Sequence, residues 1–149
     1  MALFTNAFTQ LELLRQPEQP NELLQAFDAA DEYLLSHLHG QGLTAQSRVL
    51  ILNDNFGALA CSLAGRCQLT SSGDSHLGFM ALQKNLASNL LAADSVAFVP
   101  ASDTPVGPFD SVLIRVPKTM ALLEEQLIRL QGQLAPGARV TAGAMLKHL

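Results

Sequence analysis

One stretch of the chain, residues 49–59, restricts the possible folds more than any other. Four consecutive apolar residues, Val49 to Leu52, are followed by three polar residues, by Phe56 and Gly57, and then by an apolar stretch that begins at Ala58. A continuous apolar run of this length is typical of a β-strand buried on both faces. A strand, a tight turn and a helix in direct succession predict the first unit of a doubly wound α/β sheet.

The same alternation of short apolar runs and longer helical patterns continues to the end of the chain. We expect strands at 48–52, 67–71, 94–99, 110–115 and 138–142, and helices at 57–65, 75–91 and 118–133. Residues 100–109 hold three prolines and are too few for a helix, so we expect a loop there. Successive strand–helix–strand units predict a mostly parallel sheet with right-handed crossovers and helices on both faces.

Residues 1–47 form a lead-in to this core, which we assign to residues 48–149 of one compact domain. The lead-in is expected to hold a short strand around residues 8–13 and an extra helix that begins at the capping residue Asn21. An apolar stripe at helical spacing marks that helix, and Asp31 falls off the stripe. The chain stops soon after its fifth core strand, where a parallel sheet does not usually end, so it resembles a piece of something longer.

Composition sets the limits of function. The chain has 149 residues, 48% of them hydrophobic and 15% charged, which is enough for one domain with a sizeable core. The net charge of -4 argues against a free-standing nucleic-acid binder but allows a domain that assists an RNA-contacting partner. No apolar run is long enough for a membrane span, and the N-terminus lacks a signal-peptide pattern, so we expect a cytoplasmic protein.

The cysteines and histidines do not indicate a metal site. Cys61 falls in the first core helix and Cys67 at the start of the next strand, and both are expected to be buried, reduced thiols. A zinc site needs about four ligands. His37 and His39 lie two apart on a helix and therefore point to different faces.

Three further groups of residues are candidates for binding. In nucleotide-binding versions of this fold, the turn after the first strand is rich in glycine, whereas here Asn53 and Asn55 precede Gly57. Asp74, after the second strand, could hold a ribose or cap the helix that follows. Basic residues could form an RNA-facing patch at the carboxyl edge of the sheet, or be solvated or contact another domain: Arg48, Arg115 and Lys118.

The order of elements resembles the class I methyltransferase fold, which binds S-adenosylmethionine. Three separated blocks carry a closer resemblance: residues 49–54 (VLILND), 29–35 (AADEYLL) and 116–119 (VPKT). They are similar to the N-terminal domain of bacterial ribosomal RNA guanine-N2 methyltransferases of the large-subunit RlmG type, relatives of the small-subunit RsmC type. Such enzymes carry two tandem methyltransferase-like domains, and the C-terminal one holds the cofactor and an Asn-Pro-Pro-Phe motif.

The resemblance also implies that this domain is a degenerate copy. An active copy has an acid at the position of Ile51, which cannot accept a hydrogen bond, and glycines at Asn53 and Asn55. The Asn-Pro-Pro-Phe position holds residues 115–118, so an amide is replaced by an arginine, which has no acceptor. We therefore expect no catalytic residue and no cofactor here, and only a vestigial pocket made of Asn53, Asn55, Gly57 and Asp74.

The expected function is that of a non-catalytic domain in a methyltransferase that uses S-adenosylmethionine to modify guanine in 23S ribosomal RNA. The parent protein would be an enzyme, whereas this domain by itself would not. Its partners would be the C-terminal catalytic domain and, through the basic residues, ribosomal RNA. Two alternatives stay open: a stand-alone α/β module that binds a ligand or a protein, and a working methyltransferase with an unusual cofactor pocket.

Overall fold

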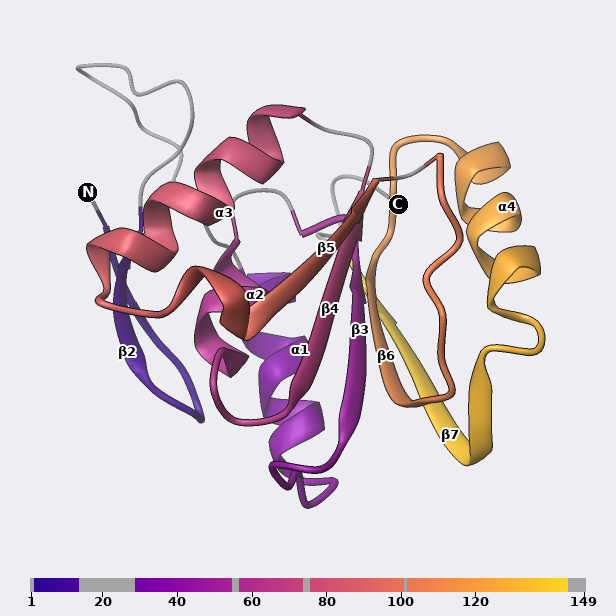
Figure 1. Cartoon of the computed structure of the whole chain (residues 1–149), viewed down its shortest axis with the longest axis horizontal. Coiled ribbons are helices and arrows are strands. Elements are labelled where there is room, and N and C mark those ends of the chain that lie inside the picture. The colour runs from indigo at the N-terminus through magenta and orange to yellow at the C-terminus, as the bar shows by residue number, and fades with distance from the viewer. Residues whose placement is uncertain (1, 14–28, 55–56, 74–75, 101, 145–149) are drawn as a thin grey trace.

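The fold is known from a computed structural model that describes residues 2–13, 29–54, 57–73, 76–100 and 102–144. A parallel sheet in the order β5-β4-β3-β6-β7 forms its centre (Figure 1). Its strands are β3 (Arg48–Leu52), β4 (Gln68–Gly73), β5 (Val96–Pro100), β6 (Phe109–Arg115) and β7 (Leu134–Gly143). The helices are α1 (Ala29–His39), α2 (Ala58–Leu63), α3 (His76–Ser88) and α4 (Met120–Leu130), with a short 3-10 turn at Ala93–Ser95. A separate antiparallel hairpin consists of β1 (Ala2–Thr5) and β2 (Gln10–Leu13).

The predicted parallel α/β sheet is confirmed, with every core strand and helix in its expected order. The connection between β5 and β6 holds no helix in its described part, residues 102–108, as its length and prolines predict. β7 begins earlier than expected, and its pairing with β6 is irregular between Phe109 and Ser111. Gly137, with a φ of 76°, lies in this irregular part.

The lead-in differs in detail from the expectation. A hairpin replaces the single predicted strand, because Ala2–Thr5 pairs with Gln10–Leu13. The helix of the lead-in is present as α1, described from Ala29 onward, and the expected cap at Asn21 lies outside the described residues.

Helices cover both faces of the sheet, but unequally (Figure 1). Val49 and Ile51 of β3 belong to one apolar cluster, which also holds the buried residues of α1, α2 and α3. Leu50 and Leu52 belong to a second, smaller cluster, which includes Leu130 of α4. Successive side chains of a strand point to opposite faces, so β3 needs apolar residues at every position.

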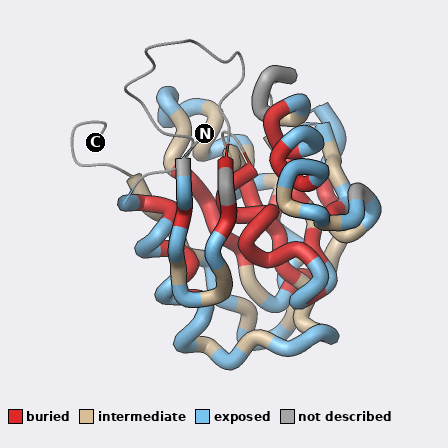
Figure 2. The backbone as a smooth tube through the Cα atoms, turned by 90° about the vertical axis from the view of Figure 1, so that its left-hand side faces the viewer, coloured by how far each residue is buried: buried red, intermediate tan, exposed pale blue. Residues whose placement is uncertain are grey.

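α2 is the most deeply enclosed helix, since all six of its residues are buried. The sheet lies on one side of it, the β1–β2 hairpin on another, and α1 and α3 are its neighbours. Its one polar residue, Ser62, donates from Oγ to the Ala58 carbonyl (2.7 Å) and accepts from the Asn6 side chain (2.9 Å). The hairpin is thereby joined to the core, whose buried residues occupy the middle of the molecule in Figure 2.

Both cysteines are free and buried, as the sequence predicted. Burial raises the pKa of the Cys61 thiol far above its ordinary value and that of Cys67 to about 11. Within the described ranges, none of the helices has the length and apolar character that would let it cross a membrane.

Gly57 provides a test of the tight turn before α2. Its φ is 87°, which is unfavourable for any residue with a side chain. An added Cβ would also lie 2.9 Å from the Leu82 Cα atom and would clash with the backbone of α3. Gly65 has a φ of 78° but open space around it. We expect Gly57→Ala to lower the free energy of unfolding by at least about 1 kcal/mol more than the control Gly65→Ala, measured by urea denaturation. Equal losses would show that the contact with α3 is unimportant.

Candidate functional site at the carboxyl edge of the sheet

The carboxyl ends of β3 and β6 mark the place where a doubly wound sheet binds ligands. From β3 the chain continues to β4 and β5 on one side, whereas β6 and β7 lie on the other side. A crevice forms outside the strand ends at such a reversal of strand order, and it is the usual ligand site of open α/β sheets. β3 ends at Leu52 and β6 ends at Arg115, so residues 53–57 and 115–118 surround this place.

The side chain of Asn53 bridges the ends of the two strands. Its Nδ2 donates to the Arg115 carbonyl oxygen and to Gln126 Oε1, both at 2.9 Å. In return, Gln126 Nε2 donates to Asn53 Oδ1 at 2.8 Å. This amide bridge joins the end of β3 to the end of β6 and to α4, and both protons of the Asn53 amide are used within the protein.

The backbone of Asn53 is also held in an uncommon conformation. Its φ is 67°, in the left-handed region that asparagine tolerates better than most residues, and its N–H donates to the Ser72 carbonyl at the end of β4 (2.9 Å). A glycine could adopt this backbone and leave the space above it open. Asparagine adopts it and fills the space with an amide.

A buried ion pair lies on the α1 side of the same edge. Arg115 Nη1 donates to Asp31 Oδ1 at 2.7 Å, and the two side chains are 10% and 3% exposed. The expectation of an open basic patch was wrong for Arg115, which is buried in this pair. Asp31, which falls off the apolar stripe of its helix, is buried as well. Arg115 points to the same face as Leu113, two positions earlier in β6, and that face is covered by α1.

The other two residues of the expected basic patch lie far apart along the strand direction. Arg48 begins β3 at the amino edge, where its guanidinium is 5.7 Å from the Phe109 ring centroid and donates to the Val106 carbonyl. Lys118 is exposed after the carboxyl end of β6. The three cations therefore do not form one surface, and contact of Lys118 with RNA stays a prediction.

Asp54 accepts hydrogen bonds from the start of α2. Its carboxylate accepts from the backbone N–H groups of Leu59 (3.3 Å) and Ala60 (2.9 Å). Burial raises the pKa of Asp54, and these hydrogen bonds and the nearby Arg115 cation oppose that rise only in part. Of the other residues in the expected vestigial pocket, Gly57 precedes α2, while Asn55 and Asp74 lie outside the described residues.

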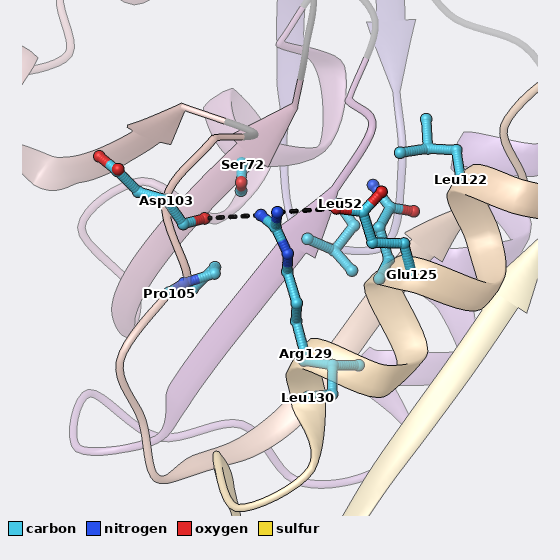
Figure 3. A pocket seen from close by; sticks show the side chains of 9 residues that line it. Leu52, Ser72, Asp103, Pro105, Leu122, Glu125, Arg129 and Leu130 are labelled. Carbon is cyan, nitrogen blue, oxygen red and sulfur yellow. Dashed lines mark hydrogen bonds and ion pairs between the residues drawn. The ribbon is translucent and has the colours of Figure 1, made fainter.

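A small cavity lies on the α4 side of the edge (Figure 3). Its volume is about 30 Å³, room for a single water molecule. Arg129 crosses it, because its guanidinium contacts Glu125 (2.7 Å) and the Asp103 carbonyl oxygen (3.4 Å). The cavity has no room for a nucleoside. In the part of the chain that the structure describes, no group of three or more His, Cys, Asp or Glu residues could hold a metal ion.

Sequence reasoning missed two residues of this edge, Asp31 and Gln126. Asp31 pairs with a residue 84 positions away, and Gln126 with one 73 positions away. In the sequence, each of them is a polar residue beside the apolar stripe of a helix. Solvated helix faces have the same pattern, so it does not indicate a buried contact.

Comparison with known proteins agrees with this fold. The RLMG N-terminal domain family matches residues 1–149. Two proteins named ribosomal RNA large subunit methyltransferase G, from Ectopseudomonas mendocina and Pseudomonas aeruginosa PAO1, are 74% and 71% identical over all 149 residues. The chain spans about 40% of the length of each of these relatives.

Solved structures resemble the chain at much lower identity. The Thermus thermophilus 16S rRNA N2 G1207 methyltransferase (RsmC), in complex with AdoMet and guanosine, is 18% identical with a TM-score of 0.74, over 95% of this chain and 40% of that one. A precorrin 8w decarboxylase from Methanobacterium thermoautotrophicum is 17% identical with a TM-score of 0.65, over 91% and 71%. These likenesses concern the fold.

Fold and site together define a Rossmann-like, methyltransferase-type α/β domain in which an asparagine side chain bonds across the strand ends at the switch point. Within that class, the chain belongs to the RLMG N-terminal domain family.

The Arg115–Asp31 pair predicts unequal effects of single and double substitutions. Arg115→Met leaves the Asp31 carboxylate buried without this cation, so we expect a loss of about 3–5 kcal/mol in the free energy of unfolding. The double variant with Asp31→Leu removes both charges, and we expect it to recover most of that loss. Chemical denaturation of the wild type, the two single variants and the double variant measures the coupling free energy between the two residues. Additive losses in the free energy of unfolding would contradict the prediction.

Asp54 predicts a pH dependence. Its raised pKa means that the folded state binds the proton more tightly than the unfolded state, so this group lowers stability as the pH rises through that range. Asp54→Asn removes the titration and keeps an oxygen acceptor for α2. We therefore expect the free energy of unfolding of the variant, relative to the wild type, to increase between about pH 3.5 and pH 7. A difference that stays constant or decreases in urea titrations would contradict the assignment.

Proposed function

We propose that the chain is the non-catalytic N-terminal domain of a methyltransferase that uses S-adenosylmethionine to methylate guanine in large-subunit ribosomal RNA. The names of the relatives support the substrate class, and the share of their length that the chain spans supports a further C-terminal part. We assign catalysis and the cofactor to that part. This domain supports it, in the cytoplasm, where ribosomal RNA is made and modified in bacteria.

The observation that carries the proposal is the amide bridge of Asn53 across the switch point. S-adenosylmethionine would have to enter the crevice between the ends of β3 and β6, which is where the Asn53 side chain bonds to Arg115 and Gln126. The adjoining cavity of about 30 Å³ accepts one water and no nucleoside. The residues present do not fit the cofactor, so no step of methyl transfer is assigned to them.

A direct role in RNA binding is the smaller part of the proposal. Phosphate contacts dominate the affinity for RNA, and this chain has a net charge of -4 and basic residues at opposite edges of the sheet. Lys118 is the exposed cation at the edge where a doubly wound fold meets its ligands. Its contribution would be a salt-sensitive contact that assists the catalytic part.

The proposal predicts the stoichiometry of cofactor binding in the full-length protein. We expect one S-adenosylmethionine per chain in isothermal titration calorimetry, because only one of two methyltransferase-like units has an open crevice. Asn53→Ala should leave both stoichiometry and affinity unchanged, whereas it would alter a site built on the turn after β3. The isolated 149-residue chain should give no heat up to millimolar ligand, a range in which about 4 kcal/mol of binding is detectable.

Two results would overturn this assignment. Two cofactors per full-length chain, one of them lost in Asn53→Ala, would make this domain a working methyltransferase with an unusual pocket. Full activity of the parent protein after removal of residues 1–149 would leave no supporting role.

A further inference from the structure

Exposed apolar side chains gather on α4 and β7, at the end of the sheet opposite to β5 (Figure 1). Met120 and Ile128 are both 64% exposed, Leu127 is 43% exposed and Val140 is 42% exposed. We refer to these four residues as the α4–β7 face. A cluster of this kind on adjacent elements differs from the scattered single apolar residues that any protein surface carries.

The geometry of the two elements places these side chains on the same side of the sheet. Val140 pairs with Val112, which belongs to the apolar cluster beneath α4, so Val140 points to the α4 side. Leu123 and Leu130 of α4 contact that cluster. Leu122, Gln126 and Arg129 lie on one flank of the helix and line the small cavity beside β3 and β4.

Met120 and Leu127 lie seven residues apart, on the opposite flank of α4. That flank faces away from the cavity and toward the β7 end of the sheet. Most residues of β7 are exposed, and none of them is fully buried.

β7 is also the longer and less protected edge of the sheet. It has ten residues, and among the described residues it pairs with β6 alone. The other edge strand, β5, has five residues, ends at Pro100 and packs its Phe98 ring against Phe79 (4.3 Å between centroids). A long edge strand beside an exposed apolar face invites aggregation unless another segment covers it.

We propose that the α4–β7 face is covered, in the full-length protein, by the polypeptide that follows residue 149, and that this is the contact through which the domain supports its C-terminal part. The proposal rests on the proposed function for the existence of that part. The relatives extend well beyond this chain, which spans 40% of their length. The end of β7 also lies near the start of α4. The Gly143 carbonyl accepts from the Val116 N–H, and Val116 lies four residues before α4 begins at Met120.

The chemistry of the face defines its occupant. The apolar residues call for a segment with its own apolar stripe, and the outer edge of β7 can accept and donate backbone hydrogen bonds to an added strand. Glu124 is exposed on α4 beside the apolar residues. A basic side chain at the rim of the incoming segment would match it.

Cysteine labelling of the full-length protein tests this contact. Leu127→Cys and Val140→Cys place thiols on the α4–β7 face, and Leu90→Cys is the control, since Leu90 is 95% exposed on the turn after α3. Labelling with a maleimide is followed at each site by peptide mass spectrometry, relative to the rate in denaturant. Cys61 and Cys67 are buried and should label slowly.

We expect the thiols introduced by Leu127→Cys and Val140→Cys to label at least tenfold more slowly than the thiol of the control variant, at every protein concentration. Exposure in the 149-residue domain differs only about twofold between these sites, so labelling within two- to threefold of the control would overturn the proposal. Protection that grows with protein concentration would overturn it as well and assign the face to a second copy. Hydrogen exchange tests the same contact without a substitution: the backbone amides of β7 should exchange more slowly in the full-length protein than in the 149-residue domain. Two cofactors per chain would overturn the proposed function and leave this contact intact.

Discussion

Burial of β3 on both faces is the constraint on which the rest of the structure depends. Its apolar side chains alternate between a large cluster under α1, α2 and α3 and a smaller one under α4. A strand of this kind must have neighbours on both edges and helices on both sides, because no part of it can face water. The sheet order β5-β4-β3-β6-β7 meets this requirement and creates a reversal of strand order beside β3.

Polar side chains bond to one another and to backbone groups at this reversal. Asn53 bonds across the strand ends to Arg115 and Gln126, Arg115 pairs with Asp31 of α1, and Asp54 holds the start of α2. Asn53 stands where nucleotide-binding versions of this fold have a glycine. The edge of the sheet has become a set of internal contacts that fix α1, α2 and α4 to the strand ends.

The unequal covering of the sheet separates two kinds of surface in one domain. Three helices and the hairpin enclose one face, so that α2 has no exposed residue. On the other face α4 covers the centre, and the β7 end shows apolar side chains to solvent. A long sheet edge beside exposed apolar side chains is typical of a surface that another polypeptide segment covers.

The sequence by itself determined the order of elements. Apolar periodicity, glycines and prolines are local signals, and they do not depend on which strands pair in the sheet. The asparagines at the turn after β3 likewise indicated a departure from the glycine-rich ligand signature, and the resemblance carried by three short blocks indicated the family later shown. Only the tertiary structure decided which groups bond to Asn53 and which charges are buried. Asp31 and Gln126 meet partners 84 and 73 residues away, and a polar residue on a helix looks the same in sequence whether water or a buried arginine lies opposite. Charge and hydrogen-bond pairing depend on distances that folding creates, so these contacts had no local signal to read.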